Sequence, residues 1–206
     1  MSEILRSIPL FSELDSSQLQ KLQDISTVQK YKDGEVFFKK GDAIKKLLIL
    51  VDGIACIYKE DKKGNEIVMG YFHRYALLAE ATALMNEGAP SSGKFKSDGI
   101  LVKIEMQAFE KDFMPLSHIS SGIIKSLLKK IKLLQQNIHL NMNTTAKEKI
   151  EYFYKNHHAL SKDLKKYEIA SILGISAETY SRNVKTLVKE EKLLTSATGY
   201  KWNNIR

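Results

Sequence analysis

Cysteine, proline and long apolar runs are scarce in this sequence of 206 residues. Cys56 is the single cysteine, which excludes an internal disulfide framework, a multi-cysteine metal site and an iron–sulfur cluster. No apolar stretch approaches the length of a membrane span, and residues 1–6 (M-S-E-I-L-R) do not resemble the apolar core of a signal peptide. We therefore expect a cytoplasmic protein with no membrane partner.

Acidic residues are absent from residues 116–143, where four lysines give a net charge of +4. Residues 1–115 carry 16 basic and 17 acidic residues, whereas residues 144–206 carry 12 basic and seven acidic ones. The overall charge of +8 is thus concentrated in the second half. This distribution favours contact between that half and a polyanion, although a solvated lysine-rich surface has the same composition.

The residue groupings typical of enzymes are also missing. We find no paired nucleophile and base, no phosphate-binding glycine loop and no histidine pair at the spacing of a metal site. We therefore expect a protein that is not an enzyme and has no metal site.

The first 115 residues contain short β-rich runs separated by glycines. Asp15 and Gln18 have the spacing of a capping box at the start of a helix. From residue 27 the pattern changes to runs such as L-L-I-L-V-D-G (47–53), while N-E-G-A-P-S-S-G (86–93) is a break before the run at 100–105. The pattern predicts a small β-roll or barrel.

A long helix is predicted after Pro115, because no proline follows it. Its apolar residues are spaced 3, 4, 3 and 4, as in a parallel two-stranded coiled coil. We expect a homodimer seam, although a helix packed on its own domain also needs an apolar stripe. The seam residues are Ile124, Leu127, Ile131, Leu134 and Ile138.

The last third contains a helix, a tight turn at Gly174, a second helix and two short strands around Gly199. This order is typical of a winged helix-turn-helix that binds double-stranded DNA. Glu178 and Arg182 project together from the second helix and suit cytosine and guanine edges. Alternatively, they form an ordinary i,i+4 ion pair. The residues suited to the DNA backbone are Lys165, Lys166, Ser176 (also an N-cap), Thr179 and Lys185.

The whole chain resembles the CRP/FNR family of bacterial transcription regulators. The resemblance rests on residues 31–42, 47–53 and 168–182. It implies an α+β fold with a cyclic-nucleotide-binding-like β-roll (1–115), a dimerisation helix (116–143) and a winged helix-turn-helix (144–206). It implies that Glu178, Ser181 and Arg182 read a TTGA-type half-site, that RNA polymerase is a partner, and that the protein is an activator. Ala177 replaces an arginine found in the CRP branch, so the outer half-site position is left unread.

In the cyclic-nucleotide-binding members, a glycine precedes the glutamate that matches Glu80, and an arginine follows about ten residues later. Here Ala79 and Tyr75 occupy glycine positions, and Ser91 and Ser92 match the arginine-containing pair. A buried cyclic phosphate would then lack its cation, so we expect no tight binding of cyclic AMP. Glu80 itself is expected to pair with backbone N–H groups or with a basic residue, namely Arg74, Lys94 or Lys96.

One alternative is a sensing module in which DNA binding is secondary. A haem-binding branch of the same family exists, and His73 is the candidate haem ligand here. A solvent-facing loop histidine is the simpler interpretation of the same residue. Otherwise no cofactor is expected.

Overall fold

The computed structural model of the chain contains two compact units, Met1–Ile131 and Lys132–Arg206. The structure describes all residues except 62–63, 65, 157–160, 162–163, 197–198 and 204–206, and within helix α5 it leaves out the side chains of residues 133 and 136–143. Among the described residues, none of the helices combines the length and the apolar character that crossing a membrane requires.

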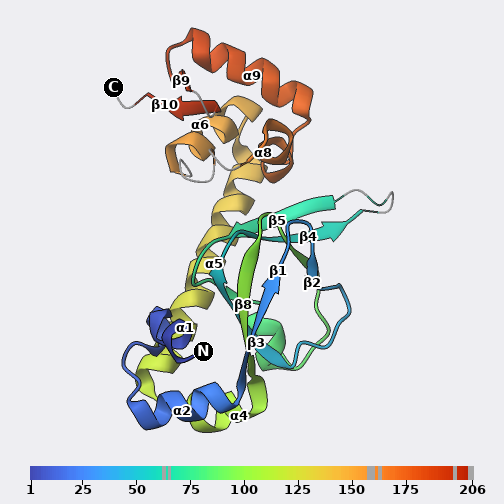
Figure 1. Cartoon of the computed structure of the whole chain (residues 1–206). Helices are drawn as coiled ribbons and strands as arrows, with labels where there is room; N and C mark the ends of the chain where they lie inside the picture. Colours follow the sequence, from blue (N-terminus) through green and yellow to red (C-terminus); the bar gives the residue numbers. More distant parts are fainter. Residues whose placement is uncertain (62–63, 65, 157–160, 162–163, 197–198, 204–206) are drawn as a thin grey trace. The chain divides into compact units, whose positions relative to one another are not determined.

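The N-terminal unit is built around two antiparallel four-stranded sheets (Figure 1), with strand orders β1-β8-β3-β6 and β2-β7-β4-β5. Their strands are β1 (Ser26–Tyr31), β2 (Val36–Phe38), β3 (Lys46–Asp52), β4 (Ala55–Glu60), β5 (Glu66–Phe72), β6 (Leu77–Leu78), β7 (Ser92–Phe95) and β8 (Gly99–Glu105). The fully buried residues of β3 and β8 lie at the centre of the core. This confirms the predicted β-roll.

Short helices accompany the sheets. They are α1 (Ser2–Ser7), the 3-10 helix η1 (Pro9–Phe11), α2 (Ser16–Asp24), α3 (Glu80–Met85) and α4 (Met106–Asp112). The predicted capping box begins α2: the Gln18 N–H donates to Asp15 Oδ1 (2.8 Å), and the Asp15 N–H donates to Gln18 Oε1 (3.0 Å). Helices α1, α2 and α4 gather on one side of the roll (Figure 1), where the Phe11 and Phe109 rings meet edge to face.

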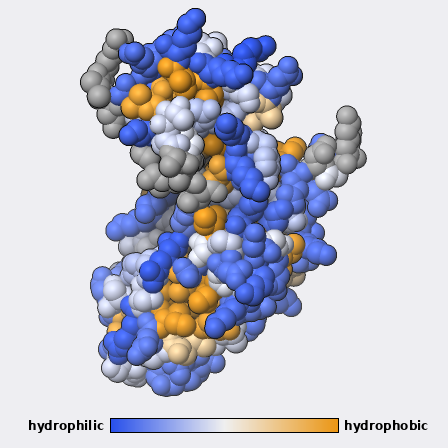
Figure 2. Space-filling model, turned by 45° about the horizontal axis from the view of Figure 1, so that its top comes forward, coloured by the Kyte–Doolittle hydropathy of each residue, from blue (hydrophilic) through white to orange (hydrophobic). Residues whose placement is uncertain are grey.

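Helix α5 (Ser117–Asn143) presents two different faces. Ile119 and Ile123 are fully buried in the core of the N-terminal unit, and Leu127 packs against that core. Among the described side chains of α5, the large apolar residues that remain exposed are Ile124, Leu128, Ile131 and Leu134. Elsewhere, the face of the molecule in Figure 2 is mainly hydrophilic, with separate apolar patches. The predicted limits at 115 and 143 remain predictions, since α5 runs on across the division between the two units.

The C-terminal unit has its own small core. Its elements after α5 are α6 (Ala146–Asn156), α8 (Lys166–Ile172), α9 (Ala177–Lys189), β9 (Leu193–Ser196) and β10 (Gly199–Trp202). Strands β9 and β10 pair antiparallel as the predicted wing. The buried residues include Ile169, Ala170, Leu173, Val184 and Leu187 of the two helices, while Ile175 packs beside them. The fold is therefore α+β, as predicted.

Candidate nucleic-acid interface and effector site

The two helices of the predicted helix-turn-helix are joined by a tight turn. Gly174 has a φ of +64°, a conformation that glycine adopts without a steric penalty. The Gly174 N–H donates to the Ser171 carbonyl (3.1 Å), and the Ile175 N–H donates to the Ala170 carbonyl (3.1 Å). These bonds use carbonyls left open at the end of α8 and direct the chain into α9.

Helix α9 begins at the predicted N-cap. The Ser176 hydroxyl accepts a hydrogen bond from the Thr179 N–H (3.1 Å) and donates to Thr179 Oγ1 (2.9 Å). Both hydroxyls that we assigned to the DNA backbone are therefore engaged in the cap, although Ser176 remains exposed and Thr179 is half-buried. The cap fixes the first turn, where the predicted base-reading residues begin.

The exposed face of α9 carries the predicted DNA-contacting residues. Glu178, Ser181, Arg182 and Lys185 lie at helical spacing and all are exposed, whereas the buried face of α9 carries Tyr180, Val184 and Leu187. Among the described ion pairs, none joins Glu178 to Arg182. Their side chains therefore lie free of the i,i+4 pairing that was the alternative to base reading.

Lysines near the start of α8 lie on the same unit. Lys165 and Lys166 are exposed, and Lys166 Nζ lies 3.4 Å from the Tyr200 hydroxyl and 5.2 Å from the centre of its ring. Tyr200 belongs to β10, so this contact connects the wing to α8. This contact was not predicted, because no spacing rule relates residues 34 positions apart.

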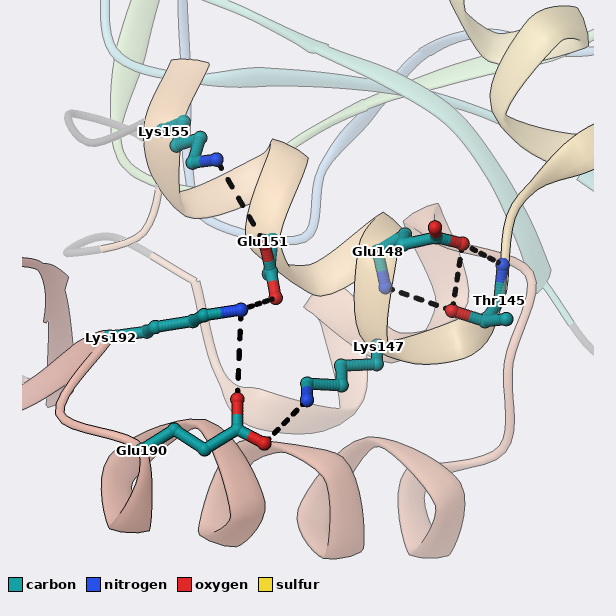
Figure 3. A network of polar contacts seen from close by, with 7 residues as sticks. All are labelled: Thr145, Lys147, Glu148, Glu151, Lys155, Glu190 and Lys192. Atoms are coloured by element: carbon teal, nitrogen blue, oxygen red, sulfur yellow. Dashed lines mark hydrogen bonds and ion pairs between the residues drawn. The ribbon is translucent and has the colours of Figure 1, made fainter.

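The last turn of α9 is held against α6 by a network of charged residues (Figure 3). Glu190 pairs with Lys147 of α6 (2.5 Å) and with Lys192 (3.6 Å), and Lys192 also pairs with Glu151 of α6 (2.8 Å). Exposed ion pairs of this kind contribute little stability individually. Together they restrict the orientation of α9 relative to α6.

Glu80 is the buried carboxylate of the N-terminal unit, with 1% of its surface exposed. It lies in the first turn of α3 and bonds to two residues of α5. The Lys130 ammonium donates to Glu80 Oε2, and the Ser126 hydroxyl donates to Glu80 Oε1 (3.0 Å). The same ammonium donates to the Leu77 carbonyl (2.8 Å).

Two of the predicted basic partners of Glu80, Arg74 and Lys94, were wrong. Arg74 stacks on Tyr75, 4.7 Å from its ring centre, and Lys94 pairs with Glu66 (2.5 Å). The side chain that neutralises Glu80 is Lys130, 50 residues further along the chain. Burial lowers the pKa of Lys130, and the neighbouring Glu80 carboxylate opposes this shift.

The two non-glycine residues at the family's glycine positions keep a glycine-like backbone. Tyr75 has a φ of +68° and Ala79 a φ of +54°, both in the left-handed region. Such a conformation costs roughly 1–2 kcal/mol for a residue with a Cβ atom. Both positions, which the resemblance matches to glycines, thus have a backbone conformation that glycine adopts without this cost.

The other predicted sensor residues have distinct surroundings. Ser91 and Ser92 are buried, and the Ser92 hydroxyl accepts a hydrogen bond from the Lys40 N–H (3.0 Å). His73 follows β5, and its Nε2 is buried with no hydrogen-bond partner among the described residues. The described residues contain no group of three or more histidine, cysteine or acidic side chains that could hold a metal ion. The Ile138 side chain lies outside the described residues.

Comparison with known proteins agrees with this architecture. Residues 28–114 match the family model of the cyclic nucleotide-binding domain. The cAMP-dependent protein kinase regulatory subunit of Mycosarcoma maydis is 28% identical over 126 residues. That match covers 57% of this chain and 23% of the relative, so the chain spans less than a quarter of that protein.

Solved structures match over nearly the whole chain. A variant of CooA from Carboxydothermus hydrogenoformans has a TM-score of 0.80 at 15% identity, covering 98% of this chain and 92% of that one. FixK2 from Bradyrhizobium japonicum has a TM-score of 0.74 at 14% identity, covering 87% of this chain and 93% of that one. The chain therefore has the fold of the CRP/FNR regulators, as the resemblance implied.

Proposed function

We propose that this protein is a homodimeric transcription regulator of the CRP/FNR type that binds double-stranded DNA through α9. The observation that carries the proposal is the exposed face of α9, with Glu178, Ser181 and Arg182 at i, i+3 and i+4 beside an N-cap and a wing. Arg182 donates two hydrogen bonds to a guanine, and Glu178 accepts from a cytosine amino group. These pairings fit a TTGA-type half-site, and Lys165, Lys166 and Lys185 hold the phosphates.

Selection of bound sequences from a random DNA pool tests this proposal directly. We expect a palindrome of TTGA-type half-sites whose centres are separated by about one helical turn. The same selection with cyclic AMP present is expected to return the same sequences at the same affinity. Recovery of unrelated sequences, without a shared half-site, would contradict the proposal.

The dimer rests on the exposed apolar residues of α5. Ile124 and Ile131 are 55% and 49% exposed, and Leu128 is 57% exposed. They lie along the helix with spacings of 4 and 3, so a second copy of α5 covers them in a parallel pair. Leu127 serves this seam less than predicted, because it packs against its own core. Analytical sedimentation tests the seam: we expect wild type to be a dimer and Ile131→Glu to be a monomer. A monomeric wild type would contradict the seam.

Independence from cyclic AMP rests on two features of the N-terminal unit. Ser91 and Ser92 provide no cation for a cyclic phosphate, and Glu80 is already engaged by Lys130 and Ser126. Calorimetric titration with cyclic AMP is therefore expected to show no tight binding.

From the resemblance to the CRP/FNR family, we also propose that the protein acts in the cytoplasm, as an activator with RNA polymerase as its partner. Transcription from a promoter carrying the selected site tests both parts.

Haem-dependent sensing is the second candidate function. The buried Nε2 of His73 has no hydrogen-bond partner among the described residues, and an imidazole in that state is suited to an axial bond. Reconstitution with haem would then give a Soret band that His73→Ala shifts or abolishes. A protein that takes up no haem after reconstitution would exclude this candidate and leave the DNA-binding proposal intact.

A further inference from the structure

We propose that the N-terminal unit contains a binding site for a primary ammonium group, and that Lys130 of the protein's own α5 fills this site as an internal ligand. The site is made by Glu80 at the start of α3, by the Leu77 carbonyl in β6 and by the Phe72 ring at the end of β5. All three groups belong to the β-roll and its helix α3, whereas the ammonium comes from the long helix α5.

The geometry selects an ammonium that carries several protons. Lys130 Nζ donates to Glu80 Oε2 and, at 2.8 Å, to the Leu77 carbonyl, so at least two N–H groups are needed. The nitrogen also lies 5.4 Å from the centre of the Phe72 ring, within the range of a cation–π contact. A quaternary ammonium can satisfy the ring but cannot donate to either oxygen. The ligand class is therefore a primary alkylammonium.

The buried Glu80 carboxylate requires a neighbouring cation. Glu80 is 1% exposed, and an ionised carboxylate buried to this degree is costly unless it is paired and hydrogen-bonded. Ser126 satisfies Oε1 with its hydroxyl but supplies no positive charge. Removing the ammonium alone would leave a buried negative charge, which creates a strong demand for a replacement cation.

The internal ligand also fixes a helix. Ser126 and Lys130 are one turn apart, so they project from the same face of α5 and join it at two points to α3 and β6. In the proposed regulator, this attachment replaces a small-molecule effector, because it sets the position of α5 on the β-roll without one. This consequence rests on the proposed function, whereas the ammonium site itself does not.

Chemical rescue tests the site. Lys130→Ala removes three methylene groups and the amine, and n-propylammonium replaces these atoms. We expect the variant to melt on the order of 10 °C lower than wild type, and n-propylammonium to restore part of this loss. The neutral n-propanol and the quaternary tetramethylammonium should not restore it. The matched control is Lys129→Ala, in which an exposed lysine of the same helix is removed and no amine effect is expected. Equal responses of Lys130→Ala and Lys129→Ala to n-propylammonium, or none, would overturn the proposal.

A second measurement uses wild-type protein and does not depend on the folding of Lys130→Ala. Reductive methylation followed by peptide mass spectrometry should modify Lys130 several-fold more slowly than Lys129, because the Lys130 amine is held by Glu80. Glu80→Gln should reduce this protection, and equal rates at Lys129 and Lys130 in wild type would count against the site. Neither melting nor methylation involves DNA, so failure of the ammonium site is distinguishable from failure of the proposed DNA binding.

Discussion

The hydroxyl groups of Tyr154 and Tyr180 lie 2.5 Å apart in the interior of the C-terminal unit. Tyr154 belongs to α6 and Tyr180 to α9, and both side chains are almost completely buried. Burial raises the pKa of both phenols, so both stay protonated and one donates to the other. This bond holds α9 against α6 directly behind the exposed face that carries Ser181 and Arg182.

Replacing Tyr180 by phenylalanine is therefore expected to destabilise the C-terminal unit. The change leaves the Tyr154 hydroxyl buried without its partner, and such a loss costs about 1–3 kcal/mol. Urea unfolding of Tyr180→Phe measures this cost. Tyr167→Phe is the matched control, since Tyr167 is an exposed residue of α8.

The double variant Tyr154→Phe/Tyr180→Phe provides a further check. It removes both hydroxyls, so no buried group is left unpaired, and its cost should be smaller than the sum of the two single costs. Strict additivity would mean that the two hydroxyls do not interact in solution.

Ala79→Gly is expected to stabilise the N-terminal unit. Ala79 has a φ of +54°, which glycine adopts without the penalty of a Cβ atom. The gain is limited by the greater freedom of glycine in the unfolded chain, so we expect about 0.5–1 kcal/mol in the free energy of unfolding. Ala81→Gly is the control, because Ala81 is exposed within α3 and the same change there should destabilise. Loss of stability in both variants would show that the Ala79 backbone is not strained.

Cys56 is expected to make stability fall at alkaline pH. Burial is the main cause that raises its pKa, from an ordinary value of 9.0 to about 11 in the folded protein, while Lys94 and Lys96 oppose the shift. Between these values the unfolded thiol ionises and the folded one does not. The contribution of the thiol is therefore complete below pH 9 and is lost as the pH rises towards 11, by on the order of 2–3 kcal/mol.

Unfolding experiments across this pH range, on wild type and on Cys56→Ala, isolate the effect. The variant should lose less stability than wild type between pH 9 and pH 11. Tyr31 is a second contributor, since burial raises its pKa to about 12, so part of the alkaline loss should persist in the variant. Identical pH profiles for both proteins would exclude the thiol as a cause.

Local signals in the sequence predicted the elements that local chemistry determines. Asp15 and Ser176 were identified as helix caps because a cap requires only a side chain and the next few N–H groups. The apolar spacing after Pro115 predicted a long helix, and α5 runs from Ser117 to Asn143. These features depend on residues a few positions apart, which a single sequence contains.

Two features were missed because they depend on distant residues. The start of strand β7 lies in residues 86–93, where the pattern predicts a break between strands because glycine is a common turn residue. In the fold, a Cβ atom at Gly93 would lie 2.6 Å from the Phe37 ring, so the glycine is needed for close packing within the sheet. The pairing of Lys130 with Glu80 was not predicted, because no rule of periodicity relates residues 50 positions apart.

Lys166→Ala is expected to weaken binding to all DNA sequences alike. Lys166 lies at the start of α8 against Tyr200 of the wing, a position suited to a phosphate rather than to a base edge. Loss of one phosphate contact should lower the slope of log affinity against log salt by about 0.9. Fluorescence anisotropy at several salt concentrations measures this slope. A loss confined to one base position would assign Lys166 to base reading instead.

Arg182→Ala should give the opposite pattern to Lys166→Ala. Arg182 lies exposed on α9, one turn after Glu178, and its guanidinium can donate two hydrogen bonds to one guanine. Its removal should cost about 1–3 kcal/mol on a TTGA-type site and flatten the preference at one base pair. Repeating the selection from random DNA with the variant measures that preference, and Thr186→Ala, on an exposed position further along α9, is the control. Lys166→Ala is expected to change how affinity depends on salt, whereas Arg182→Ala is expected to change how affinity depends on one base pair. An unchanged base preference in Arg182→Ala would therefore exclude this arginine as a base reader, even if overall affinity fell.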